Sequence, residues 1–142
     1  MGKTFALKIV TPSHDVYDGN AEKIFLKNSS GELEILANHE NMITSTVPYI
    51  TRFLDDKGTE QKLFISSAIV YVSDGNVTVC TDAAEFPEDI DFDRAEKAKD
   101  RAEEKLKNAE DYERKIYNLA LARAVERLKS VSYTHLRAHE TT

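Results

Sequence analysis

The sequence predicts a β-then-α fold, in which an N-terminal antiparallel β-sandwich or barrel is followed by a C-terminal antiparallel helical hairpin. Two observations predict it. Before Pro87, apolar residues recur at every second position in many short segments, which is the period of a half-buried strand. After Pro87, they recur at steps of three and four while the charge density rises, as in amphipathic helices. Because no helical run separates the strands, an antiparallel sheet is favoured.

The first part of the chain is a succession of short strand patterns separated by turn residues. The segment 4–10 places alternate apolar side chains on one face, and Thr11-Pro12 ends it because proline cannot donate to a ladder. Residues 18–20, Asp-Gly-Asn, predict a turn, and so do residues 29–31. The other strands are expected at 21–27, 32–35, 42–44, 49–54, 62–66, 69–72 and 77–81, with a tight hairpin at 73–76.

The second part predicts two helices joined by a short connection. Asp91 is a suitable N-cap for the first helix, and Asn108 is a suitable break after it. Each helix carries one narrow apolar stripe, and the alanines would let the two axes approach closely. Such a hairpin buries little apolar surface, so we expect it to be marginally stable and able to move. The stripes are Ala95, Ala98, Ala102, Leu106 and Ala109, then Tyr117, Leu121, Ala124 and Leu128.

Composition excludes several classes of function. The formal net charge of −6 argues against general nucleic-acid binding, which needs a basic face. The single cysteine, Cys80, excludes an internal disulfide and fits a reducing compartment. No secretory signal is visible, and the apolar stretches are too short to span a bilayer. Any membrane association is therefore expected through a partner.

No catalytic or metal-binding constellation is visible. The chain lacks a glycine-rich phosphate loop and a dinucleotide fingerprint. Cys80 lies in an expected strand, where a packing role explains it better than a thiolate does. His14 and His39 are far apart in sequence and lie in expected loops. An independent enzyme is therefore not predicted, and no cofactor is required.

Four arginines form the one suggestive cluster. Arg94 and Arg101 are seven residues apart on the first helix, and Arg123 and Arg127 are four apart on the second, so each pair shares a face. In a folded hairpin the four guanidinium groups could converge and bind phosphate oxygens. Glu85 and Asp91 lie near the same end and could accept hydrogen bonds from a nucleotide. The alternative is that these arginines are solvated or paired with nearby carboxylates.

Residues 131–142 do not extend the stripe of the second helix. They look like a translated sequencing-adaptor read-through, and the alternative is a natural disordered tail. The predicted organisation is thus a β-sandwich over 1–87, a helical hairpin over 88–130 and a non-native tail over 131–142.

Several motifs, in the same order along the chain, resemble the epsilon subunits of bacterial F-type ATP synthases. The first is Ile9-Val10-Thr11-Pro12 with Val16-Tyr17-Asp18-Gly19, and the second is Gly31-Glu32-Leu33-Glu34-Ile35 with His39 and Ile43-Thr44. The helical part begins with Ile90-Asp91-Phe92-Asp93-Arg94-Ala95, similar to the family's I-D-x-x-R-A motif. Its last helix contains Leu119–Ala124 and Arg127-Leu128. The resemblance covers residues 4 to 130.

This resemblance implies a flattened ten-stranded β-sandwich and a regulatory helical hairpin. It implies a non-catalytic rotor subunit of the central stalk that couples proton translocation to ATP synthesis. The implied partners are the gamma subunit, the proton-carrying c-subunit ring, and the alpha and beta subunits reached by the extended hairpin. The implied location is the cytoplasmic face of the bacterial plasma membrane, as a peripheral part of the complex.

The resemblance also implies particular site residues. The stretch Ser30-Gly31-Glu32, with His39 nearby, is expected to face the ring and the stalk. In some members of the family ATP binds the folded hairpin as a regulatory ligand, and the matching positions here are Glu85, Ile90, Asp91, Arg94, Arg101, Arg123 and Arg127.

The sequence departs from the family at Glu34, where glycine is usual, and at Ala37, where proline is common, which puts the geometry of the ring-facing loop in question. The alternative reading of the whole chain is a soluble β-sandwich adaptor with a coiled-coil interaction arm.

Overall fold

A computed structural model describes the backbone of residues 3–140 and the side chains of residues 3–131. The chain divides into two compact units, and the boundary falls between Glu85 and Phe86. The first unit is all β and the second is helical, so the predicted fold class is confirmed.

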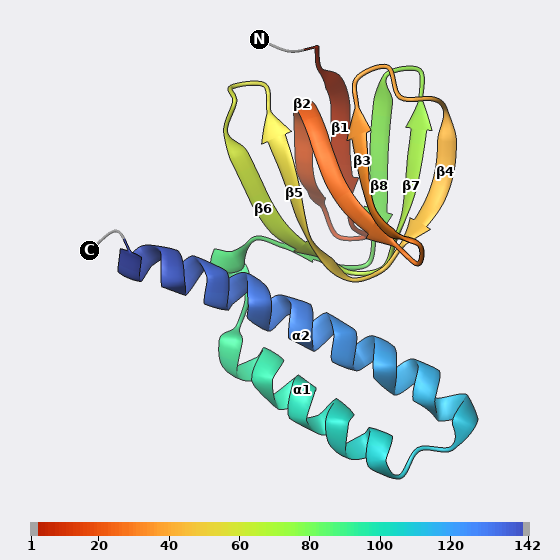
Figure 1. The fold of residues 1–142 in the computed structure, drawn as a ribbon, viewed down its shortest axis with the longest axis vertical. Helices are drawn as coiled ribbons and strands as arrows, with labels where there is room; N and C mark the ends of the chain where they lie inside the picture. The colour runs from red at the N-terminus through yellow and green to blue at the C-terminus, as the bar shows by residue number, and fades with distance from the viewer. Residues whose placement is uncertain (1–2, 141–142) are drawn as a thin grey trace. The chain divides into compact units, whose positions relative to one another are not determined.

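Within the described residues, nine strands form the first unit (Figure 1). Their ladder runs β4-β7-β8-β1-β2-β5-β6-β9, with β3 pairing β2 outside this path. All pairs are antiparallel except β1 with β8, which is parallel. The strands are β1 (Phe5–Val10), β2 (Asp15–Asn28), β3 (Gly31–Leu36), β4 (Met42–Thr46), β5 (Tyr49–Asp55), β6 (Glu60–Ile65), β7 (Ala68–Ser73), β8 (Asn76–Thr81) and β9 (Ala84–Glu85).

The turn predicted at residues 18–20 is wrong. These residues lie inside β2, a strand of 14 residues that Figure 1 draws as a strongly curved ribbon. β2 pairs with β1 up to Ala21 and with β3 and β5 beyond it, and its register with β5 shifts between Ala21 and Lys23. A bulge of this kind bends a strand without ending it. The described residues thus form nine strands, where the resemblance implied ten.

The core of the β unit comes from alternate residues of these strands. In β1, β7 and β8 the inward positions are buried and the outward positions are not, as a period of two requires. Phe53 and Phe64 are its largest fully buried side chains, each 0% exposed. The strongest apolar alternation in the sequence therefore corresponds to the packed interior.

The second unit contains a short 3₁₀ turn, η1 (Pro87–Asp89), followed by α1 (Phe92–Lys107) and α2 (Asp111–Glu140). Asp91 is the N-cap of α1, and its carboxylate accepts a hydrogen bond of 3.0 Å from the backbone N–H of Arg94. Asn108 is the C-cap, so both predicted boundaries of the first helix are confirmed. The backbone of α2 continues through residues 131–140, whose non-native origin stays a prediction.

Small residues form the contact between the two helices. Ala95 and Ala102 of α1 and Ala124 of α2 are 5%, 4% and 1% exposed. Ala95 and Ala102 are seven residues apart on α1, so they lie on one face of that helix. The predicted alanine stripe is therefore the seam along which α1 and α2 pack antiparallel (Figure 1).

Candidate functional sites

The seam places the four arginines on one side of the hairpin. Arg94 and Arg101 each precede a buried alanine of α1, and Arg123 precedes the buried Ala124 of α2. In two right-handed helices that run antiparallel, residues that precede the seam residues turn toward the same side of the pair. Arg127, three residues after Ala124, turns to that side as well. The convergence expected from spacing is thus compatible with the packing.

The arginines lie at two levels along the hairpin. The two helices run antiparallel, and the end of α1 at Lys107 lies beside the start of α2 at Asp111. Each step back along α1 is therefore matched by one step forward along α2, so the numbers of neighbouring residues add up to about 218. Arg94 is then level with Arg123, near the start of α1. Arg101 lies seven residues further on, which is about 10 Å at 1.5 Å per residue. Arg94, Arg123 and Arg127 therefore lie level with the start of α1, and Arg101 lies closer to the turn.

The other candidate ligands of a nucleotide have different surroundings. Asp91 already accepts the N–H of Arg94, which leaves its second carboxylate oxygen for another donor. Ile90, just before it, is buried at 9% exposure. Glu85 belongs to β9 in the β unit, where it pairs with Phe64. Six of the seven positions therefore lie in the helical unit.

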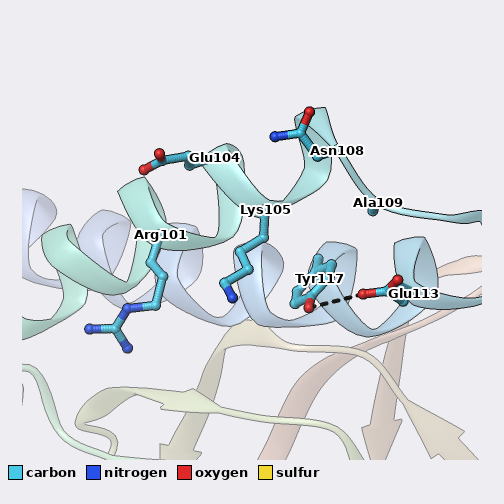
Figure 2. A pocket seen from close by; sticks show the side chains of 7 residues that line it. All are labelled: Arg101, Glu104, Lys105, Asn108, Ala109, Glu113 and Tyr117. Atoms are coloured by element: carbon cyan, nitrogen blue, oxygen red, sulfur yellow. Dashed lines mark hydrogen bonds between the residues drawn. The ribbon is translucent and has the colours of Figure 1, made fainter.

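A pocket of about 470 Å³ opens between the helices near the hairpin turn. Figure 2 shows Arg101 and Lys105 of α1 pointing to the same side, and the Tyr117 hydroxyl of α2 donating to the carboxylate of Glu113 over 3.2 Å. Burial first, and then that hydrogen bond, raise the pKa of Tyr117. Sequence spacing predicted that Arg101 shares a helix face with Arg94, but it did not indicate that Lys105 lies beside Arg101.

The β2–β3 turn is built by local interactions. The amide oxygen of Asn28 accepts the N–H of Ser30 over 2.9 Å, and Gly31 has a φ of +131°, which favours glycine. Ser30 and Glu32 are exposed. Glu34, where the family usually has glycine, lies in the regular ladder opposite Phe25 and has no positive φ. The departure at Glu34 therefore leaves this strand unchanged.

The carboxylate of Glu32 is held by residues of β5. One oxygen accepts a hydrogen bond from the Tyr49 hydroxyl, and the other lies 3.4 Å from the Arg52 guanidinium. Arg52 also lies over the ring of Phe25 at 4.3 Å and 3.9 Å from Glu60. Sequence reasoning missed Tyr49 and Arg52, because only the pairing of β2 with both β3 and β5 brings them to Glu32.

His39 is not brought close to Glu32. Glu32 lies at the start of β3 and His39 follows its end, and the four steps from Glu32 to Leu36 span about 13 Å at the rise of a strand. His39 lies in the β3–β4 loop, which Asn41 ties to the β7–β8 hairpin by accepting the N–H of Asp74 over 3.0 Å. The expectation that His39 lies near residues 30–32 is therefore wrong.

Within the described residues, no three His, Cys, Asp or Glu side chains gather as a metal site would require. In the same part of the chain, none of the helices has the length and apolar character that crossing a membrane would need.

Both parts of the chain match known families along their length. Residues 4–87 match the beta-sandwich domain of the ATP synthase delta/epsilon chain, and residues 88–131 match its long alpha-helix domain. The chain belongs to the ATP synthase delta/epsilon chain family. The tail expected to be non-native lies almost wholly beyond this match, since the helical domain ends at residue 131.

Individual relatives agree with this assignment. The chain is 50% identical to the ATP synthase epsilon chain of Clostridium botulinum (strain Eklund 17B / Type B) over 128 residues, 90% of this chain and 96% of the relative. It is 47% identical to that of Clostridium novyi (strain NT) over 131 residues, 92% of this chain and 100% of the relative. The expected family is confirmed, and with it the prediction of a non-catalytic subunit of an enzyme complex.

A solved structure supports the same fold. A chain in the structure of the Euglena gracilis mitochondrial ATP synthase, containing OSCP, F1 and the c-ring, superposes with a TM-score of 0.75 at 22% identity. The match covers 92% of this chain and 81% of that one. At this identity the likeness shows the arrangement of strands and helices and nothing further. Family membership over both parts also leaves the alternative of a free-standing adaptor without support.

Proposed function

We propose that this chain is a central-stalk subunit of an F-type ATP synthase that couples proton translocation to ATP synthesis, and that its helical hairpin restrains ATP hydrolysis. The partners in this proposal are a gamma subunit, a ring of proton-carrying c subunits, and the alpha and beta subunits. In this proposal, these partners hold the chain at the cytoplasmic face of the plasma membrane. Family membership over residues 4–131 supports the proposal.

ATP is the proposed regulatory ligand of the hairpin. The observation that carries this step is the placement of Arg94, Arg123 and Arg127 on one side of an alanine seam, near the start of α1. Guanidinium groups stay charged at ordinary pH and bind phosphate oxygens bidentately. Asp91, at the same end, has one carboxylate oxygen beyond the one used for capping. An anion with several phosphates and some hydroxyl donors fits this combination.

The effect of such a ligand on the hairpin can be bounded. A ligand that binds only the folded hairpin stabilises it by RT ln(1 + [L]/Kd), about 2.7 kcal/mol at a hundredfold excess over Kd. A hairpin with two equally populated states would then move almost fully to the folded one. The small seam, made largely of alanines, leaves the hairpin marginal enough for this energy to matter.

Calorimetric titration of the full chain with ATP, and in parallel with ADP, tests the proposal. We expect saturable ATP binding that Arg94→Ala abolishes or weakens by at least about tenfold, since a charge-assisted contact is lost. Arg114→Ala is the matched control, because its position in α2 turns it to the other side of the seam. No heat at millimolar ATP would remove the ligand from the proposal and leave a hairpin set by rotation and partner contacts.

A further inference from the structure

At the end of the β unit that carries the β2–β3 turn, the β4–β5 connection is bonded to the strand that leads into this turn. The turn comprises Ser29 and Ser30, and the β4–β5 connection comprises Val47 and Pro48. The N–H of Val47 donates to the carbonyl of Lys27 over 2.9 Å, which ties the connection to the last residues of β2. These two loops therefore lie side by side at one end of the sheet.

Side chains add a second tie between the same loops. Tyr49, the first residue of β5, donates its hydroxyl hydrogen to Glu32, and the ammonium group of Lys27 lies 5.7 Å from the centre of the Tyr49 ring. Arg52 holds the other carboxylate oxygen of Glu32 from further along β5. The Glu32 carboxylate thus spans β2, from β3 on one side to β5 on the other.

This arrangement changes what Glu32 can offer a partner. Its charge is balanced by Arg52, and each of its oxygens has a donor within the chain. An ion pair at the surface contributes little to stability by itself. Here, however, Arg52 is also fixed by Phe25 and Glu60, so little further entropy is lost when it holds Glu32. The outer part of the turn, Ser29 and Ser30, stays exposed and uncharged.

We propose that Tyr49 is a positioning residue for the rotor contact: by holding Glu32, whose charge Arg52 balances, it joins the β2–β3 turn and the β4–β5 connection into one rigid surface. Glu32 then acts on the ring through the position of the turn and not through its own charge. This inference rests on the proposed function and on the expectation, implied by the family resemblance, that the β2–β3 turn faces the c-subunit ring.

Two variants separate position from charge. Glu32→Gln removes the negative charge but keeps an amide oxygen that can accept a hydrogen bond from the Tyr49 hydroxyl. Tyr49→Phe removes the donor but keeps the ring and the carboxylate. A positioning role predicts that Tyr49→Phe is the more damaging change, because Glu32→Gln keeps an acceptor for the Tyr49 hydroxyl. A direct ionic contact with the ring predicts the reverse. Tyr112→Phe, at a tyrosine that is 78% exposed on α2, is the matched control.

Two measurements read the outcome. Hydrogen exchange on the full chain should show the amides of residues 29–33 exchanging about tenfold faster in Tyr49→Phe, as expected when a hydrogen bond to a charged group is lost. In a clostridial ATP synthase depleted of its own epsilon chain and rebuilt with this one in vesicles, Tyr49→Phe should lower protons pumped per ATP hydrolysed by about twofold. Tyr112→Phe should match the wild type in both measurements, and Glu32→Gln should lose less than Tyr49→Phe in each.

The inference is overturned if Glu32→Gln uncouples the complex while Tyr49→Phe does not, or if Tyr49→Phe leaves both exchange and pumping unchanged. If the wild-type chain itself fails to restore pumping, the proposed function falls, and the rotor contact falls with it. The exchange measurement then still decides whether the turn is held by Tyr49.

Discussion

The ring of Tyr17 lies against the ring of Phe53, with centroids 4.6 Å apart and planes inclined by 56°. Tyr17 belongs to the first half of β2 and Phe53 to β5, which pairs with the second half of β2. The Tyr17 hydroxyl also donates to the carbonyl of Asn20 over 3.0 Å. One aromatic contact therefore spans the bend in β2, between the part that pairs with β1 and the part that pairs with β5.

Phe53→Ala should be among the most destabilising substitutions in the β unit. Phe53 is 0% exposed, and its truncation leaves a cavity and removes the support of Tyr17, at a cost of about 3–5 kcal/mol. Phe92→Ala, at a phenylalanine that is 43% exposed, should cost less than about 1 kcal/mol. Urea unfolding followed by near-ultraviolet circular dichroism checks this. Equal losses would mean that Phe53 does not anchor the core.

Gly31→Ala should destabilise the β2–β3 turn through the backbone alone. A Cβ at Gly31 would meet no atom within 4 Å, but the φ of +131° is one that alanine rarely adopts. Strain of this kind costs about 1–3 kcal/mol. The midpoint of urea unfolding should fall for Gly31→Ala and much less for Ser30→Ala. If Gly31→Ala and Ser30→Ala have the same midpoint of urea unfolding, the turn accommodates alanine without strain.

Asp91→Ala should weaken the start of α1 by about 1 kcal/mol, because it removes the acceptor for the Arg94 N–H. Asp93→Ala, inside the first turn of the same helix, removes a favourable charge but no capping bond and should cost less. Far-ultraviolet circular dichroism during thermal unfolding measures the difference. A larger loss in Asp93→Ala would contradict the assignment of the cap.

Asp55 should contribute to the loss of stability in acid. The N–H of Thr59, 2.9 Å from its carboxylate, is the largest cause of a lowered pKa, and Gln61 and Lys57 also donate to it. Because the folded-state pKa lies below the unfolded value of 3.8, this stabilisation is present above that pH. It is lost as the pH falls through the folded-state pKa.

Asp55→Asn should therefore flatten the dependence of unfolding free energy on pH below 3.8, the unfolded-state pKa of this carboxyl. Urea unfolding from neutral pH into the acid range gives that dependence directly. Asp56→Asn, in the same turn, is the matched control. If the pH dependence of the unfolding free energy below pH 3.8 is the same in Asp55→Asn and the wild type, other carboxylates dominate that dependence.

Local patterns were sufficient for most element positions. A period of two identified the strands because each has one face in the core, and Asp91 and Asn108 marked the first helix because capping depends on neighbours in sequence. The same local reasoning failed at Asp18-Gly19-Asn20. These residues are typical of turns, but pairing with β1 keeps them in a strand, and ladder hydrogen bonds outweigh local turn preference.

By itself, the sequence determined the order of sandwich and hairpin, the alanine seam and the separate faces that carry each pair of arginines, because these follow from periods of two and 3.6 within single segments. Only the tertiary structure decided that Glu32 is held by Tyr49 and Arg52, and that His39 lies at the other end of β3. Those relationships depend on which strands pair and in which register, and register is set by packing between residues far apart in the chain.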